Sequence, residues 1–296
     1  MASDRPMVSA ENPATRALEA LIDRLHARGR LRVWSLVITI FGDAIVPRGG
    51  RVSLSALQDI MARLRIEPGA LRTAMSRLAS DHWVTRERQG RNSFFRLDEH
   101  GRHAFDLATR RIYASGPPAW TGRWTVALAP PGVDEKTVSE LTALGFLRIN
   151  GAVHLRPETA DAADAGDALS GMLVVHGESA EHPEAFRALW PSEQIGDAYR
   201  AFVDAYRPLA DALQGGRRMT PLDAMTARTL LIHDWRRIVL RDPGLPLALL
   251  PEAWPGEAAR EIARDIDRLL HEPSENWLDA AGLKAATAGR ERFASV

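Results

Sequence analysis

The sequence predicts an α+β protein built from several domains, on three observations. At 296 residues, the chain is longer than the roughly 100–200 residues of a typical domain. Segments with the alternating or short apolar pattern of strands occur in two clusters within residues 50–180. From residue 192 onward the apolar residues recur only at helical spacing, so the last third is predicted to be all helical.

The first predicted element is a helix between Asn12 and Gly29. Asn12 favours the N-cap, Pro13 favours the first helical position, and Gly29 favours the position after the helix end. Leucine and isoleucine side chains recur between them at helical spacing. Residues 1–29 are therefore predicted to form an N-terminal arm with one helix.

Residues 30–97 show the order helix, short strand, helix, turn, helix and β-hairpin. Ser55, with Gln58 three residues later, has the form of a capping box for the second of these helices. The predicted ranges are Leu31–Phe41, Val52–Leu54, Ser55–Arg65, Ala70–Asp81, Val84–Arg88 and Phe94–Leu97. This order is typical of a winged helix-turn-helix, whose third helix enters the major groove of DNA. A last helix from Asp98 to about Tyr113 completes a domain predicted for residues 30–115.

Polar and basic residues gather on the third helix and on the hairpin. Leu71, Met75 and Leu78 fall at i, i+4 and i+7 and predict a buried face, which leaves the intervening polar residues on the other face. Donors on that face and on the hairpin suit phosphates and base edges. The predicted DNA contacts are Arg72, Thr73, Ser76, Arg77, Arg86, Arg88, Arg91 and Asn92. The alternative is a winged-helix adaptor for protein contacts, in which these residues are only solvated.

The zero net charge conceals an uneven distribution. The chain has 38 basic and 38 acidic side chains, but residues 30–111 contain 15 basic and 8 acidic ones, a net of +7. Residues 131–190 contain 4 basic and 10 acidic side chains, a net of −6. Such asymmetry favours nucleic-acid contact by the first segment. We attribute the predominance of arginine over lysine to base composition of the genome.

Residues 119–191, after a linker at Gly116–Pro118, predict a ferredoxin-like α+β domain. Asn150-Gly151 is a strong hairpin signal. The acidic segment Glu158–Leu169 is either helical or loose. The other predicted elements are strand Trp124–Leu128, helix Asp134–Leu144, strands Phe146–Ile149, Val153–Leu155 and Met172–His176, and helix Pro183–Leu189. The order strand, helix, strand, strand, helix, strand is that of a ferredoxin-like fold. Residues 192–296 form the helical part, with breaks expected at residues 214–216, 243–246 and Pro273.

Several functional classes lack their motifs. The chain has no cysteine, which excludes disulfides, thiol nucleophiles and zinc sites built on thiolates. It contains no phosphate-binding glycine loop, no Gly-x-Ser-x-Gly and no His-Glu-x-x-His motif. His100 and His103 are three apart on a predicted helix, but no third metal ligand is evident. Without a signal peptide or a long apolar stretch, we expect a cytoplasmic protein that is not an enzyme and has no cofactor or metal.

Two blocks of the chain have a distinctive sequence. The first comprises Leu36–Gly50, Leu71–Leu78 and Trp83–Arg96, and the second comprises Arg228–Pro243 and Leu249–Gly256. Together they resemble the PaaX family of bacterial repressors of phenylacetic acid catabolism. The resemblance implies a homodimer that binds operator DNA and is released by an acyl-CoA effector, typically phenylacetyl-CoA. It also implies a winged helix, a ferredoxin-like middle domain and a helical C-terminal effector and dimerisation domain. That middle domain is similar to the fold of the CRISPR-associated Cas2 nucleases. A nuclease would need a carboxylate near the end of the first strand, and the nearest acid is Asp134.

The second block contains a cluster of cations. His233, Arg236 and Arg237 lie at i, i+3 and i+4, and Arg241 follows at i+8. Cations beside apolar surface suit the phosphates and the acyl tail of a CoA thioester. The alternative is that the arginines form ion pairs with Asp234, Asp242 or the acidic middle domain. With the resemblance taken into account, neither interpretation is favoured over the other.

The functional hypothesis is a repressor of an aromatic-acid catabolic operon that an aryl-CoA thioester releases from DNA. The alternatives are an acyl-CoA-binding enzyme that keeps a winged helix, and a winged-helix adaptor without specific DNA binding.

Overall fold

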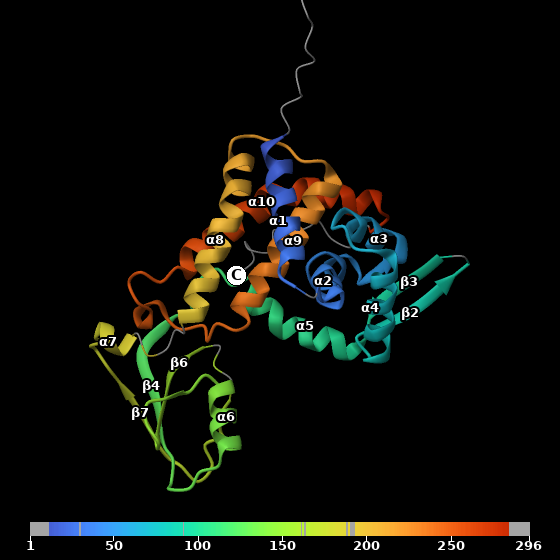
Figure 1. The fold of residues 1–296 in the computed structure, drawn as a ribbon. Coiled ribbons are helices and arrows are strands. Elements are labelled where there is room, and N and C mark those ends of the chain that lie inside the picture. The colour runs from blue at the N-terminus through green and yellow to red at the C-terminus, as the bar shows by residue number, and fades with distance from the viewer. Residues whose placement is uncertain are drawn as a thin grey trace, which may run out of the picture. The chain divides into compact units, whose positions relative to one another are not determined.

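The computed structural model describes residues 12–29, 31–90, 92–160, 162, 164–187, 189 and 193–283. These residues form helices and two antiparallel sheets, of three and four strands, as expected for an α+β protein (Figure 1). They divide into two compact units. Unit 1 takes its described residues from 1–115, 198–240 and 257–296, and unit 2 takes them from 116–197 and 241–256.

The N-terminal part of unit 1 follows the order that the sequence predicts. Its elements are α1 (Pro13–Ala27), α2 (Val33–Ile40), the π-helical turn η1 (Phe41–Ile45), the 3₁₀ turn η2 (Val46–Arg48), β1 (Arg51–Ser53), α3 (Leu54–Arg63), α4 (Pro68–Ser80), β2 (Val84–Gln89), β3 (Asn92–Leu97) and α5 (Glu99–Ile112). The strand order is β1-β3-β2, and Gln89 pairs with Asn92 at the end of the hairpin.

Side-chain caps begin three of these helices, α1, α3 and α5. The predicted cap of α1 is confirmed, because Asn12 Oδ1 accepts a hydrogen bond from the Ala14 amide at 3.0 Å. The predicted cap of α3 is wrong: Ser53, not Ser55, accepts from the Ala56 amide at 3.2 Å. Ser53 ends β1 in an extended conformation, which is the backbone geometry an N-cap needs.

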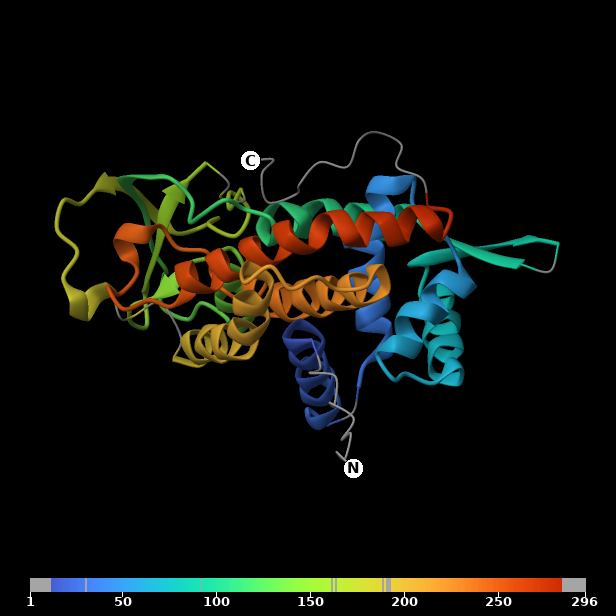
Figure 2. The same ribbon diagram turned by 90° about the horizontal axis from the view of Figure 1, so that it is seen from above.

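The C-terminal helices of unit 1 pack directly on the N-terminal ones. They are α8 (Glu193–Gln214), α9 (Pro221–Val239) and α10 (Gly256–Ala280). α9 is buried without interruption from Ala224 to His233 and contacts α1, α2, α3 and α5. A helix that is buried all round forms the centre of a domain. Figure 2 shows α10, in red, running alongside α9, in orange.

The break that we expected at Pro273 is wrong, because α10 continues through this residue. A proline inside a helix costs about 3 kcal/mol or more, since it removes a hydrogen bond and clashes with the preceding turn. Leu270 and Leu278, on either side of it, are almost completely buried. Burial of such side chains stabilises by about 1.5–3 kcal/mol each, which offsets the cost.

Unit 2 contains a four-stranded sheet with helix α6 on one face. Its elements are β4 (Trp120–Leu128), α6 (Glu135–Ala143), β5 (Leu147–Arg148), β6 (Val153–Thr159), β7 (Leu173–Glu178), α7 (Glu184–Arg187) and the 3₁₀ turn η3 (Leu247–Leu249). The strand order is β5-β6-β4-β7, and every pairing is antiparallel. Ala127 packs with Leu141 of α6, whereas Trp124 packs with Leu249 and Leu250 from the other side.

The acidic segment after β6 is loose rather than helical. β6 extends to Thr159, and the described residues between β6 and β7 form only turns. The hairpin signal at Asn150 is confirmed, because its Oδ1 accepts from the amides of Ala152 and Val153, both at 3.1 Å.

Candidate nucleic-acid interface

Helix α4 has the two faces that its sequence predicts. Leu71, Met75 and Leu78 are buried. The predicted DNA-contacting residues of this helix, Arg72, Thr73, Ser76 and Arg77, are all exposed. Pro68 occupies the first turn, so the helix starts two residues before the predicted range. The exposed face is thus a continuous row of hydroxyl and guanidinium donors.

The contacts that these side chains make within unit 1 are weak or local. Thr73 Oγ1 donates to the carbonyl of Gly69, one turn earlier, at 3.0 Å. Arg77 Nε lies 3.5 Å from Asp81 Oδ2, and its side chain is 69% exposed. Exposed ion pairs of this kind contribute about 0–1 kcal/mol. Little free energy is therefore lost when Arg77 leaves Asp81 to bind a DNA phosphate.

The β2–β3 hairpin carries a second group of cations. All residues of β2 after Val84 are exposed. Arg86 Nη2 donates to Ser93 Oγ at 2.8 Å, and Arg88 Nε donates to the Gly90 carbonyl at 3.4 Å. Asn92 is exposed at the start of β3. The predicted contact Arg91 lies outside the described residues.

Two further arginines, which sequence reasoning missed, lie on the same small sheet. Arg51 of β1 pairs in register with Arg96 of β3, and both side chains contact Glu87, at 3.1 and 3.4 Å. The Arg51 guanidinium also lies over the Phe94 ring, 3.6 Å from its centroid. Their proximity could not be predicted from local sequence, because the β1–β3 pairing is formed by segments about forty residues apart.

Two residues of the proposed effector cluster, His233 and Arg236, contact helix α2. His233 is buried, and its Nδ1 lies 3.2 Å from Thr39 Oγ1. Arg236 Nη2 donates to the Ser35 carbonyl at 3.1 Å and to Ser35 Oγ at 2.8 Å. Arg237 is exposed near the end of α9, and Arg241 belongs to unit 2.

Burial governs the titration of both α9 residues. Burial, aided by the positive charges of Arg236 and Arg237 and opposed by Asp234, lowers the pKa of His233 to about 4. Burial, together with the neighbouring Arg237, lowers the pKa of Arg236 to about 10. Asp234, one of the partners considered for the arginines, pairs with Arg28 and accepts a hydrogen bond from Tyr206.

Neither a metal centre nor a membrane-spanning helix is evident in the described part of the chain. It contains no group of three or more His, Asp or Glu residues able to hold a metal ion. The side chains of His100 and His103 are outside the description. None of the described helices combines the length and the apolar character that a membrane span requires.

Comparisons with known proteins find family matches in two segments of the chain. The family described as PaaX-like protein matches residues 32–101, and the PaaX-like protein C-terminal domain matches residues 190–280. The transcriptional repressor PaaX of Escherichia coli (strain K12) is 29% identical over 248 residues, which cover 78% of each chain. The structure of an uncharacterized protein from Mycobacterium tuberculosis is similar in fold, with a TM-score of 0.52 and 19% identity, over 91% of this chain and 98% of the other. The matched segments contain the polar face of α4, the β2–β3 hairpin and the buried helix α9, and we conclude that the chain belongs to the PaaX family.

Proposed function

We propose that the protein is a DNA-binding transcriptional repressor. The observation that carries this proposal is the exposed polar face of α4 next to the basic β2–β3 hairpin, within the segment that matches the PaaX-like family. The similar Escherichia coli protein is named a transcriptional repressor, which supports the same role here. A repressor acts on DNA in the cytoplasm.

The order α2, β1, α3, α4, β2, β3 and the sheet order β1-β3-β2 support a winged helix-turn-helix within residues 30–115. In this interpretation α4 is the recognition helix and the β2–β3 hairpin is the wing. A homodimer would present two copies of α4 to half-sites about 34–36 Å, or a multiple of this, apart. The strand order β5-β6-β4-β7 with α6 on one face supports a ferredoxin-like domain within residues 119–191.

The regulatory part of the proposal is that an aryl-CoA thioester such as phenylacetyl-CoA releases the protein from the operator of an aromatic-acid catabolic operon. The effector would bind the DNA-incompetent arrangement more tightly and so shift the population away from DNA. Among His233, Arg236, Arg237 and Arg241, the exposed Arg237 is the member of unit 1 most accessible to a phosphate. His233 and Arg236 contact α2, so a ligand that draws Arg236 away from Ser35 would loosen the packing of α2 on α9.

A mobility-shift assay at fixed salt tests this function. Fragments of promoters neighbouring the gene are compared with a coding fragment of equal length, each with and without a panel of aryl-CoA thioesters. We expect the protein to bind one promoter fragment preferentially and one thioester to release the protein from that fragment. Free CoA is the inactive control. Equal binding to all fragments would indicate an adaptor, and consumption of a thioester without DNA would indicate an enzyme.

A further inference from the structure

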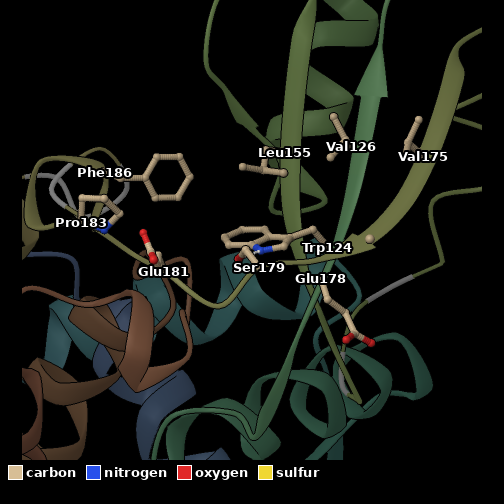
Figure 3. A pocket seen from close by; sticks show the side chains of 10 residues that line it. Trp124, Val126, Leu155, Val175, Glu178, Ser179, Glu181, Pro183 and Phe186 are labelled. Atoms are coloured by element: carbon tan, nitrogen blue, oxygen red, sulfur yellow. Dashed lines mark hydrogen bonds between the residues drawn. The ribbon is translucent and has the colours of Figure 1, made fainter.

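Unit 2 contains an open pocket of about 370 Å³ on the sheet face opposite α6 (Figure 3). Ala127 faces α6, and side chains alternate along a strand, so Trp124 and Val126 project from the other face. Leu155 of β6 and Val175 of β7 are in register with Val126 and complete the floor. The segment after β7, with Ser179, Pro183 and Phe186, forms a wall.

The floor of this pocket leaves apolar surface open to water. Val175 is 47% exposed, and its neighbours on the same face, Leu173 and Leu128, are 64% and 37% exposed. Small-molecule sites are concave, mostly apolar surfaces with a few placed polar groups. Binding of a ligand that covers this floor would be stabilised by the burial of apolar surface that is exposed in the free protein.

The aromatic part of the pocket is held in place before any ligand binds. Trp124 is only 5% exposed, and its Nε1–H donates to Ser179 Oγ at 2.6 Å. Ser179 Oγ lies 2.9 Å from His182 Nε2, and the Phe186 ring meets Trp124 edge-on, with centroids 6.1 Å apart. A fixed indole with a satisfied N–H offers an aromatic surface at little entropic cost.

The polar groups of the pocket determine which charge it accepts. Figure 3 shows the Glu181 carboxylate beside the rings of Phe186 and Trp124. The Glu178 carboxylate points away from this aromatic group and lies 3.6 Å from Arg123 Nη1. None of the described lining residues is basic. An anionic group inside the pocket would therefore face a negative charge without a compensating cation.

We propose that this pocket binds an uncharged aromatic group and discriminates against the corresponding aryl carboxylate. The inference rests on the proposed function only for the natural ligand, which would be the aryl end of the thioester effector. The thioester carbonyl is uncharged, whereas the free aromatic acid is an anion at neutral pH. Glu181 would thus let the protein respond to the activated acid and not to its precursor, while the CoA phosphates stay outside this pocket.

The charge test compares phenylacetamide with phenylacetate, using the full chain and ligand-observed NMR titrations without DNA. The two probes share the benzyl group and differ in charge. We expect the amide to bind about five- to tenfold more tightly, the range for one partly exposed charge. Glu181→Gln should bring the two dissociation constants within about twofold, mainly by strengthening phenylacetate binding. Glu178→Gln is the matched control and should preserve the preference, because its carboxylate points away from the rings.

A second variant tests the location. A Cβ built on Gly177, which faces the pocket beside Trp124, meets no atom within 4 Å, so Gly177→Leu fills the pocket without straining the strand. It should abolish amide binding. Gly151→Leu, in a turn outside the pocket and equally open, should not. Equal affinity of wild type for the two probes, no binding of either, or unchanged binding in a folded Gly177→Leu protein would each overturn the proposal. Because no readout uses DNA, these results are separate from those that test repression.

Discussion

Arg228 Nε of α9 lies 2.8 Å from Asp43 Oδ2 of η1, and their side chains are only 4% and 2% exposed. Asp43 also accepts a hydrogen bond from Tyr113 at 2.6 Å, and Arg228 Nη1 donates to Glu275 of α10 at 2.9 Å. Burial by itself would lower the pKa of Arg228, but Asp43 and Asp267 raise it overall. This buried ion cluster joins the two sequence segments that match the family.

Loss of the Arg228 charge should destabilise unit 1 strongly. Arg228→Met removes the buried cation that pairs with the buried Asp43 carboxylate, and such a change costs about 3–5 kcal/mol of unfolding free energy. Urea denaturation followed by circular dichroism measures it. Arg77→Met removes an exposed pair and should cost no more than about 1 kcal/mol. Equal losses for the two variants would show that the buried cluster is not a main determinant of stability.

The buried His233 should make the protein sensitive to mild acid. Its pKa is about 4 in the folded chain and about 6.5 when unfolded, so between these values the unfolded state binds more protons. Stability from this group is therefore present above pH 6.5 and is lost as the pH falls toward 4, by about 3 kcal/mol in total.

Urea denaturation between pH 7 and pH 4 tests this sensitivity against His233→Gln, which cannot titrate. The variant should be less stable at pH 7 because it repacks around Thr39, but its stability should fall less steeply on acidification. Parallel pH profiles for wild type and variant would refute the assignment.

Removal of the α4 guanidinium groups should reduce operator binding. Arg72→Ala with Arg77→Ala deletes two exposed donors of the recognition face, each worth about 1–3 kcal/mol if it reads a base. Mobility shifts at fixed salt measure the change. Arg268→Ala, a similarly exposed arginine on α10, is the control and should bind as the wild type does. Wild-type affinity in the α4 double variant would exclude α4 as the recognition helix.

Arginines of the β2–β3 hairpin should contribute to DNA affinity by contacting phosphates. Arg88→Ala should weaken binding to operator and to unrelated DNA by the same factor, and should reduce the slope of log K against log salt by about 1. Titrations of both DNAs at several salt concentrations give the two slopes. A loss restricted to the operator would instead place Arg88 at a base edge.

Two helical glycines should respond oppositely to the same substitution. A Cβ on Gly101 of α5 would lie 2.8 Å from the Trp83 carbonyl oxygen, so Gly101→Ala forces a backbone shift and should be destabilising. Gly69 of α4 has only the end of the Arg72 side chain nearby, at 3.9 Å. Gly69→Ala should therefore stabilise by about 0.5–1 kcal/mol. Thermal unfolding compares them, and a loss of stability for Gly69→Ala would contradict the reasoning.

Local chemistry explains which elements were predictable. The cap at Asn12, the faces of α4 and the turn at Asn150 depend on residues within a few positions of one another, and all three predictions are confirmed. The break predicted at Pro273 failed because burial of residues far from it in sequence outweighs the local cost of proline. The cap of α3 failed because β1 pairing holds Ser53 in the extended conformation of a cap.

Local patterns were enough to predict most helices and strands, the polar face of α4 and the basic character of residues 30–111, because periodicity, capping and charge are short-range properties. The central place of α9 in unit 1, and the hydrogen bond from Arg236 to Ser35, 201 residues away in the chain, emerge only from the packing of the folded chain. This packing also created the pocket beside Trp124, from strands that are distant in sequence. Such contacts depend on how amphipathic surfaces pack against one another, and several packings are compatible with one local pattern.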